Sequence, residues 1–167
     1  MSTRVCLVTP APPGSLKGNR ITALRWARFL RELGRRVAVA EEYRGQRCDL
    51  LVALHALRSA PSVERYRSAH PDGPLVVALT GTDLYDSLHT HAEARRAVEL
   101  ATRLIVLQPL GVAELPEAVR ARARVIYQSV PTPRRRAAPC QDRFDVCVLG
   151  HLRPVKDPFR TAWAARG

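Results

Sequence analysis

Short apolar stretches alternate with amphipathic stretches along most of this chain, and this alternation limits the fold more than any other feature. The apolar stretches are uninterrupted, as in strands that a parallel sheet buries on both faces. The amphipathic stretches repeat apolar residues at helical spacing. Strands that alternate with helices predict a doubly wound, Rossmann-like α/β domain with a parallel sheet. We expect strands at 4–9, 37–40, 50–54, 74–79, 104–107 and 124–127, and helices at 19–33, 59–69, 91–102 and, as one or two short helices, 111–120.

The sequence predicts a domain, a linker and the beginning of a second domain. The first domain covers residues 1–128. The stretch 129–143 holds three prolines and three consecutive arginines, which is typical of an extended, solvated linker. Residues 144–167 contain one more predicted strand, at 144–149, a basic loop, and a helix at 157–165. A single strand–helix unit cannot bury a core of its own, so we expect the remainder of a C-terminal domain to be missing.

The charge of the chain limits the classes of molecule that it can bind. The net charge is +12 and the isoelectric point is near 10.9, which is compatible with nucleic acid, anionic lipid or small anions. Three Phe, two Trp and four Tyr are not interleaved with the arginines, so a base-stacking surface is not expected. No apolar run approaches the roughly 20 residues that cross a bilayer, and no signal-peptide pattern opens the chain. We expect a cytoplasmic protein that binds small anionic molecules, with no nucleic-acid or membrane partner.

The cysteines predict neither a disulfide framework nor a metal site. Cys6, Cys48, Cys140 and Cys147 show no Cys-x-x-Cys spacing. Cys6 and Cys147 lie inside apolar strand patterns, where a thiol behaves as a small apolar side chain. We expect all of them to be reduced and structural.

The loop after the first predicted strand is basic and leads into a helix. Free backbone N–H groups and the helix dipole favour an anion at such a place. Gly18 would let the backbone approach a phosphate-like group, and Lys17 and Arg20 would neutralise it. Alternatively the loop is plain and Asn19 caps the helix. The loop is neither Gly-x-Gly-x-x-Gly nor a Walker loop, so neither a dinucleotide nor ATP is expected.

Polar residues also follow three further strands. His55 can act as a general base or as a hydrogen-bond donor to phosphate, or it can be structural. Gly81, Thr82 and Asp83 can hydrogen-bond a polar substrate, although Asp83 can instead cap a helix. Gln108 offers an amide to a hydroxyl-rich ligand. Ligands bind at the carboxyl ends of parallel strands, so these five residues are site candidates, with His55 and Asp83 as the catalytic candidates.

A second basic loop follows the linker. Gly150, Arg153 and Lys156 form the pattern Gly-x-x-Arg-x-x-Lys after the predicted strand at 144–149. An arginine and a lysine with this spacing, on a loop that enters a helix, can clamp a diphosphate. The alternative is a solvated basic turn.

Together these motifs resemble the GT-B glycosyltransferases of group 1, family 4, and most closely the selenosugar synthases of selenoneine biosynthesis. The resemblance covers essentially the whole chain. It implies a reaction in which selenophosphate is joined to the sugar of a UDP-sugar, with formation of a carbon–selenium bond and release of UDP and phosphate. It implies no metal and no other cofactor. The most specific strings are Pro13-Gly-Ser-x-x-Gly-Asn-Arg20, Ala78-Leu-Thr-Gly-Thr-Asp-Leu-Tyr85 and Val148-Leu-Gly-His-Leu-Arg-x-Val-Lys-Asp-Pro-Phe159.

The resemblance also assigns roles to the candidate residues. In the family most of the nucleotide site lies in the second domain, so we expect this chain to have weak or no transferase activity. A generic family 4 glycosyltransferase with a hydroxyl acceptor, and a non-catalytic anion- or nucleotide-binding module, are the alternatives. The implied selenophosphate side consists of Lys17, Gly18, Asn19, Arg20, Gly81, Thr82 and Gln108, and the implied diphosphate side of Gly150, Arg153 and Lys156.

Overall fold

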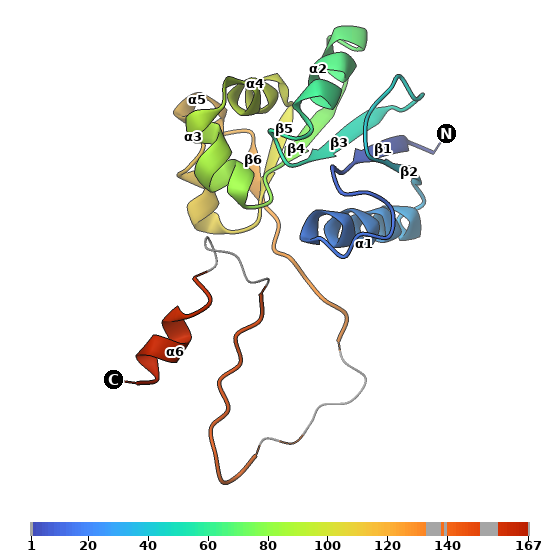
Figure 1. Ribbon diagram of the computed structural model, residues 1–167. Helices are drawn as coiled ribbons and strands as arrows, with labels where there is room; N and C mark the ends of the chain where they lie inside the picture. Colours follow the sequence, from blue (N-terminus) through green and yellow to red (C-terminus); the bar gives the residue numbers. More distant parts are fainter. Residues whose placement is uncertain (1, 133–137, 139, 151–156, 167) are drawn as a thin grey trace. The chain divides into compact units, whose positions relative to one another are not determined.

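All strands of the sheet run in the same direction, with helices on both of its faces (Figure 1). The computed structural model describes residues 2–132, 138, 140–150 and 157–166. The chain forms two units, Met1–Ser129 and Val130–Gly167, and the sheet belongs to the first. The predicted α/β class with a parallel sheet is confirmed. The elements of the first unit are β1 (Arg4–Val8), α1 (Gly18–Glu32), β2 (Arg36–Ala40), β3 (Leu50–Leu54), α2 (Ala60–Ala69), β4 (Leu75–Ala78), η1 (Asp83–Ser87), α3 (Leu88–Thr90), α4 (Ala92–Leu100), β5 (Arg103–Val106), η2 (Pro109–Val112), α5 (Glu117–Arg120) and β6 (Ala123–Val125).

The order of the strands contains a crossover point, where the chain changes the side of β1 on which it adds strands. The six-stranded sheet has the order β2-β1-β3-β4-β5-β6. From β1 the chain turns through α1 to β2 at one edge, and it then crosses to β3 on the other side of β1. The loops after β1 and β3 therefore leave the sheet toward opposite faces, and Val8 pairs with Ala53 at the ends of these two strands. Such a crossover point opens a crevice at the carboxyl edge of a parallel sheet.

Two apolar cores hold the helices against the sheet. On one face, α1 presents the small residues Ala23 and Ala27, so its backbone lies close to Leu7 and Leu54. The opposite face carries α2, α4 and α5, as Figure 1 shows. Continuous apolar strands are required because both faces are covered. The largest side chains of this second core with under 2 % exposure are Tyr43, Tyr66, Leu51, Leu75, Leu79, Leu104 and Leu115.

Helix α1 ends where the sequence predicts. Leu33 is its C-terminal cap and Gly34 follows with φ 75°. Only glycine adopts this left-handed conformation without a steric cost, so the glycine stop is confirmed. At the other end the helix begins at Gly18, and Lys17 is the N-cap residue. Asn19 lies inside the helix, so the alternative in which Asn19 caps it is wrong.

The predicted strand at 144–149 is wrong. These residues have no regular secondary structure, and the side chains of Phe144 and Leu149 are 92 % and 91 % exposed. A strand needs a neighbour to pair its N–H and C=O groups, and no described residue of this unit pairs with it. Cys147 is accordingly exposed rather than buried. The helix predicted at 157–165 is present as α6 (Arg160–Ala164).

Within the ranges that the structure describes, no helix combines the length and the apolar character needed to cross a bilayer.

Candidate functional site at the carboxyl edge of the sheet

The carboxyl edge carries the candidate residues of the first unit. Each of the loops after β1, β3, β4 and β5 leaves this edge because all strands are parallel. The sequence-predicted residues Lys17, His55, Asp83 and Gln108 thus come from four loops on one side of the sheet. The diphosphate candidates belong to the second unit: Gly150 is exposed, and Arg153 and Lys156 lie outside the described residues.

The beginning of α1 is open. Lys17 is extended, with φ −66° and ψ 145°, and no side chain caps the helix. The first N–H groups of a helix have no acceptor within the helix, and they carry the positive end of its dipole. A Cβ added to Gly18 would meet no atom within 4 Å. The fold therefore has room beside these N–H groups, which an anion could occupy.

Two buried polar atoms near this loop lack partners. Thr9 follows β1 directly and is 0 % exposed, and neither its Oγ1 nor the Nε of Arg20 has a hydrogen-bond partner in the part of the chain that the structure describes. Buried polar atoms are normally paired, so these two are exceptions close to the loop after β1. Thr9 was not expected from the sequence, because a threonine after an apolar strand carries no distinctive pattern.

His55 sits in a strained turn directly after β3. Its φ is 74°, in the left-handed region, where a residue other than glycine costs about 1 kcal/mol or more. Three hydrogen bonds hold the turn: the His55 N–H donates to Ala78 O at 2.8 Å, the Ser59 N–H donates to His55 O at 3.0 Å, and the Ser59 hydroxyl donates to Leu54 O at 2.7 Å. The side chain of His55 therefore has a fixed origin at the carboxyl edge.

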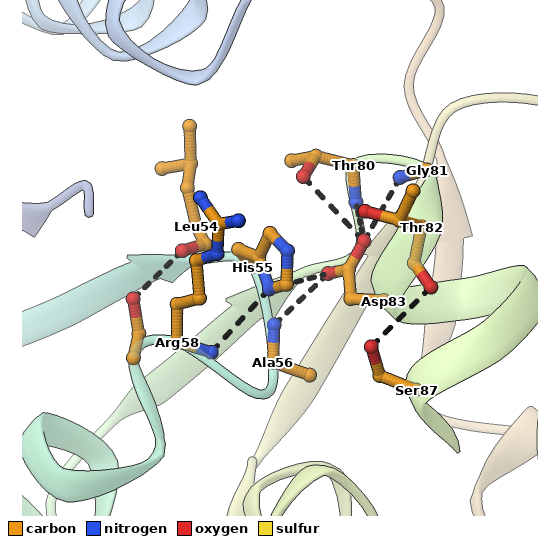
Figure 2. A network of polar contacts seen from close by, with 10 residues as sticks. Leu54, His55, Ala56, Arg58, Thr80, Gly81, Thr82, Asp83 and Ser87 are labelled. Carbon is orange, nitrogen blue, oxygen red and sulfur yellow. Dashed lines mark hydrogen bonds and ion pairs between the residues drawn. The ribbon is translucent and has the colours of Figure 1, made fainter. Parts of the chain in front are cut away.

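Asp83 is the centre of the polar network in Figure 2. It is 0 % exposed. Its Oδ1 accepts the N–H groups of Thr80 and Gly81, both at 2.9 Å, and its Oδ2 accepts the N–H of Ala56 at 2.9 Å. The carboxylate thus ties the turn after β3 to the loop after β4. Its lone pairs are engaged by backbone donors, which favours a positioning role over proton transfer; that it is catalytic stays a prediction.

Contacts within the chain also occupy some polar groups of the other candidate residues. Because the Gly81 N–H donates to Asp83, it is not free for a ligand. The carbonyl oxygen of Thr82 accepts the Ser87 hydroxyl at 3.4 Å. The Gln108 amide donates to the hydroxyl of Tyr85 on η1. The roles of Gly81, Thr82 and Gln108 in ligand binding stay predictions, and the π-helical turn η1 itself was not expected from the sequence.

The surroundings of His55 favour the neutral form of its imidazole. Its Nδ1 accepts the Arg58 N–H at 3.4 Å and lies 4.0 Å from the Oδ2 of Asp83. Burial lowers the pKa of His55, the Asp83 carboxylate acts in the opposite direction, and the positive charge of Arg58 lowers the pKa further. A neutral imidazole can donate one hydrogen bond and accept another.

Arg58 is a residue that the sequence analysis did not include in the site. Its side chain is exposed, and its charge is close enough to act on His55. Figure 2 shows it extending from the same turn. The signal that could have found it is its position, three residues after a strand-end histidine.

Comparison with known proteins gives no assignment. No protein-family model matches this chain, and no curated protein matches it.

Proposed function

We propose that this chain is the anion-binding part of a GT-B glycosyltransferase that joins selenophosphate to the sugar of a UDP-sugar. The observation that carries the proposal is the crossover between β1 and β3, where the open, basic beginning of α1 and the strained turn of His55 follow adjacent strands. The identity of the substrates comes from the sequence motifs.

The geometry supports an anionic acceptor at the first loop. Selenophosphate is a small, multiply charged anion. The N-terminus of α1 supplies unpaired N–H groups and a positive dipole end, and Lys17 and Arg20 supply two cationic side chains at the beginning of the same helix. Together these groups would hold the phosphoryl oxygens and leave the selenium free to react.

The proposed reaction is a displacement at the anomeric carbon of the sugar. The anionic selenium attacks this carbon, a carbon–selenium bond forms, and the carbon–oxygen bond to UDP breaks with its electron pair leaving on the diphosphate. Water then cleaves the selenium–phosphorus bond and releases phosphate. Cationic groups around the diphosphate would stabilise the charge that develops on it; Arg153 and Lys156 are the candidates for this role.

The test measures UDP release by this chain from UDP-sugars, with and without selenophosphate. We expect slow release that requires selenophosphate. Release that is equally fast with a hydroxyl acceptor would indicate a generic glycosyltransferase instead. Absence of selenophosphate binding in calorimetry would contradict the proposal, whether or not UDP is released.

A further inference from the structure

We propose that the turn after β3 is a second oxyanion-binding element, in which His55 donates a hydrogen bond through Nε2–H and Arg58 supplies the positive charge. The proposal deepens the proposed function and rests on it for the identity of the anion. It assigns His55 as a donor rather than a general base, and it adds Arg58 to the site.

The contacts of the imidazole indicate which of its two nitrogens carries the proton. Figure 2 shows that both marked contacts of the His55 ring end on the same nitrogen, Nδ1. The Arg58 N–H donates to this nitrogen at 3.4 Å, so Nδ1 is unprotonated. In a neutral imidazole the proton then lies on Nε2, which makes Nε2–H a donor. The distance of 4.0 Å between Nδ1 and the Oδ2 of Asp83 is too long for the hydrogen bond that a general base would need at this nitrogen.

The carboxylate of Asp83 is held at 4.0 Å from Nδ1 by its own hydrogen bonds, so it does not bond to the imidazole. Its Oδ2 already accepts the N–H of Ala56, and its Oδ1 accepts two further N–H groups. These donors hold the carboxylate in place, so it cannot move toward Nδ1 without breaking them. Asp83 therefore positions the turn. Burial lowers the pKa of His55 and so does Arg58, against the opposing effect of the Asp83 charge.

The turn that presents His55 is held rigidly by hydrogen bonds. The backbone of His55 is fixed at both its N–H and its C=O, and the Ser59 hydroxyl closes the turn against Leu54. Donors held before a ligand arrives lose little entropy when it binds. Arg58 adds a guanidinium, whose planar fork matches the oxygens of a phosphoryl group.

Two substitutions of His55 separate the donor role from the base role. In His55→Gln the amide nitrogen stands near the position of Nε2 and can still donate. In His55→Asn the amide stands near Nδ1 and nothing reaches the position of Nε2, while asparagine tolerates the left-handed backbone. Thermal unfolding of both variants shows whether each still folds.

The experiment titrates inorganic phosphate into the chain and its variants and follows binding by calorimetry. We expect His55→Gln to keep the affinity within about threefold, and His55→Asn and Arg58→Ala each to lose roughly tenfold or more, as for a lost hydrogen bond to a charged group. Arg96→Ala is the control for net charge, because Arg96 is exposed on α4 and pairs only with Glu99, at 3.9 Å, among the described residues. It should leave the affinity unchanged.

Nitrogen NMR of the imidazole near neutral pH gives an independent readout. We expect an unprotonated Nδ1 and a protonated Nε2. A protonated Nδ1, or equal loss of affinity in His55→Gln and His55→Asn, overturns the donor role. Unchanged affinity in His55→Asn and Arg58→Ala overturns the second element but leaves the α1 site of the proposed function intact. If the unaltered chain binds neither phosphate nor selenophosphate, both proposals fail.

Discussion

Asp83 illustrates at the scale of one residue how burial decides a role. A carboxylate after a strand is equally compatible with a catalytic base and with a structural tie, and only its surroundings separate them. Its complete burial and its backbone donors, which include the N–H of Ala56 27 residues earlier in the chain, favour the tie. The sequence could not predict this, because residues so distant meet only after the sheet has formed.

This role predicts the effect of Asp83→Asn on stability. An asparagine keeps the shape of the side chain, but its amide group must face at least one backbone donor that the carboxylate now accepts. We expect the free energy of unfolding to fall by roughly 2 to 3 kcal/mol. The measurement is equilibrium unfolding in denaturant.

Asp86→Asn is the matched control for this change. Asp86 lies on the same helical turn, and its side chain is exposed. Its replacement should change the free energy of unfolding by less than about 0.5 kcal/mol. Equal stability of the two variants, with activity lost only in Asp83→Asn, would show that Asp83 is a catalytic group after all.

At the scale of elements, the sequence predicts the sheet well and the second unit poorly. The strands of the first unit are short and largely apolar, and β1, β3, β4 and β5 are followed by helical segments, so their parallel arrangement could be predicted. The stretch at 144–149 is apolar apart from Asp145, but it has no strand partner among the described residues. Apolar character measures the tendency to be buried; it does not tell whether a neighbouring strand is present.

At the beginning of α1, one substitution should affect the stability of the fold and the binding of selenophosphate differently. Gly18 is the first residue of the helix, and a Cβ there would meet no atom within 4 Å. Gly18→Ala should therefore leave stability unchanged or raise it, by up to about 1 kcal/mol. It should weaken selenophosphate binding, because the methyl group would occupy the space beside the free N–H groups.

Gly81→Ala provides the contrast. Gly81 has φ 142°, a conformation that is strained for any L side chain, so this substitution should destabilise the fold. Thermal unfolding and calorimetry on both variants measure the two effects separately. If Gly18→Ala bound selenophosphate as tightly as the unaltered chain, the anion would not lie against the backbone of α1.

At the scale of the first unit, Met1–Ser129, the order of the strands explains why residues so distant in sequence share one edge. After β2 at one edge, the chain returns to form β3 on the other side of β1. The loop of Lys17 and the turn of His55 therefore follow neighbouring strands. Alternation of strands and helices predicts a parallel sheet, and a parallel sheet predicts a ligand at its carboxyl edge. The motifs then suggest which ligand, and this step depends on residue chemistry rather than on the fold.

The central claim is that the basic beginning of α1 holds selenophosphate, and Arg20→Ala tests it most directly. Calorimetry should measure the affinity of the chain for selenophosphate, with Arg28→Ala as the control, because Arg28 lies on the same helix and pairs with Glu32 at 3.4 Å. We predict that Arg20→Ala lowers the affinity for selenophosphate by roughly tenfold or more, with no change in Arg28→Ala. An equal loss in both variants, or no loss in Arg20→Ala, would contradict the claim.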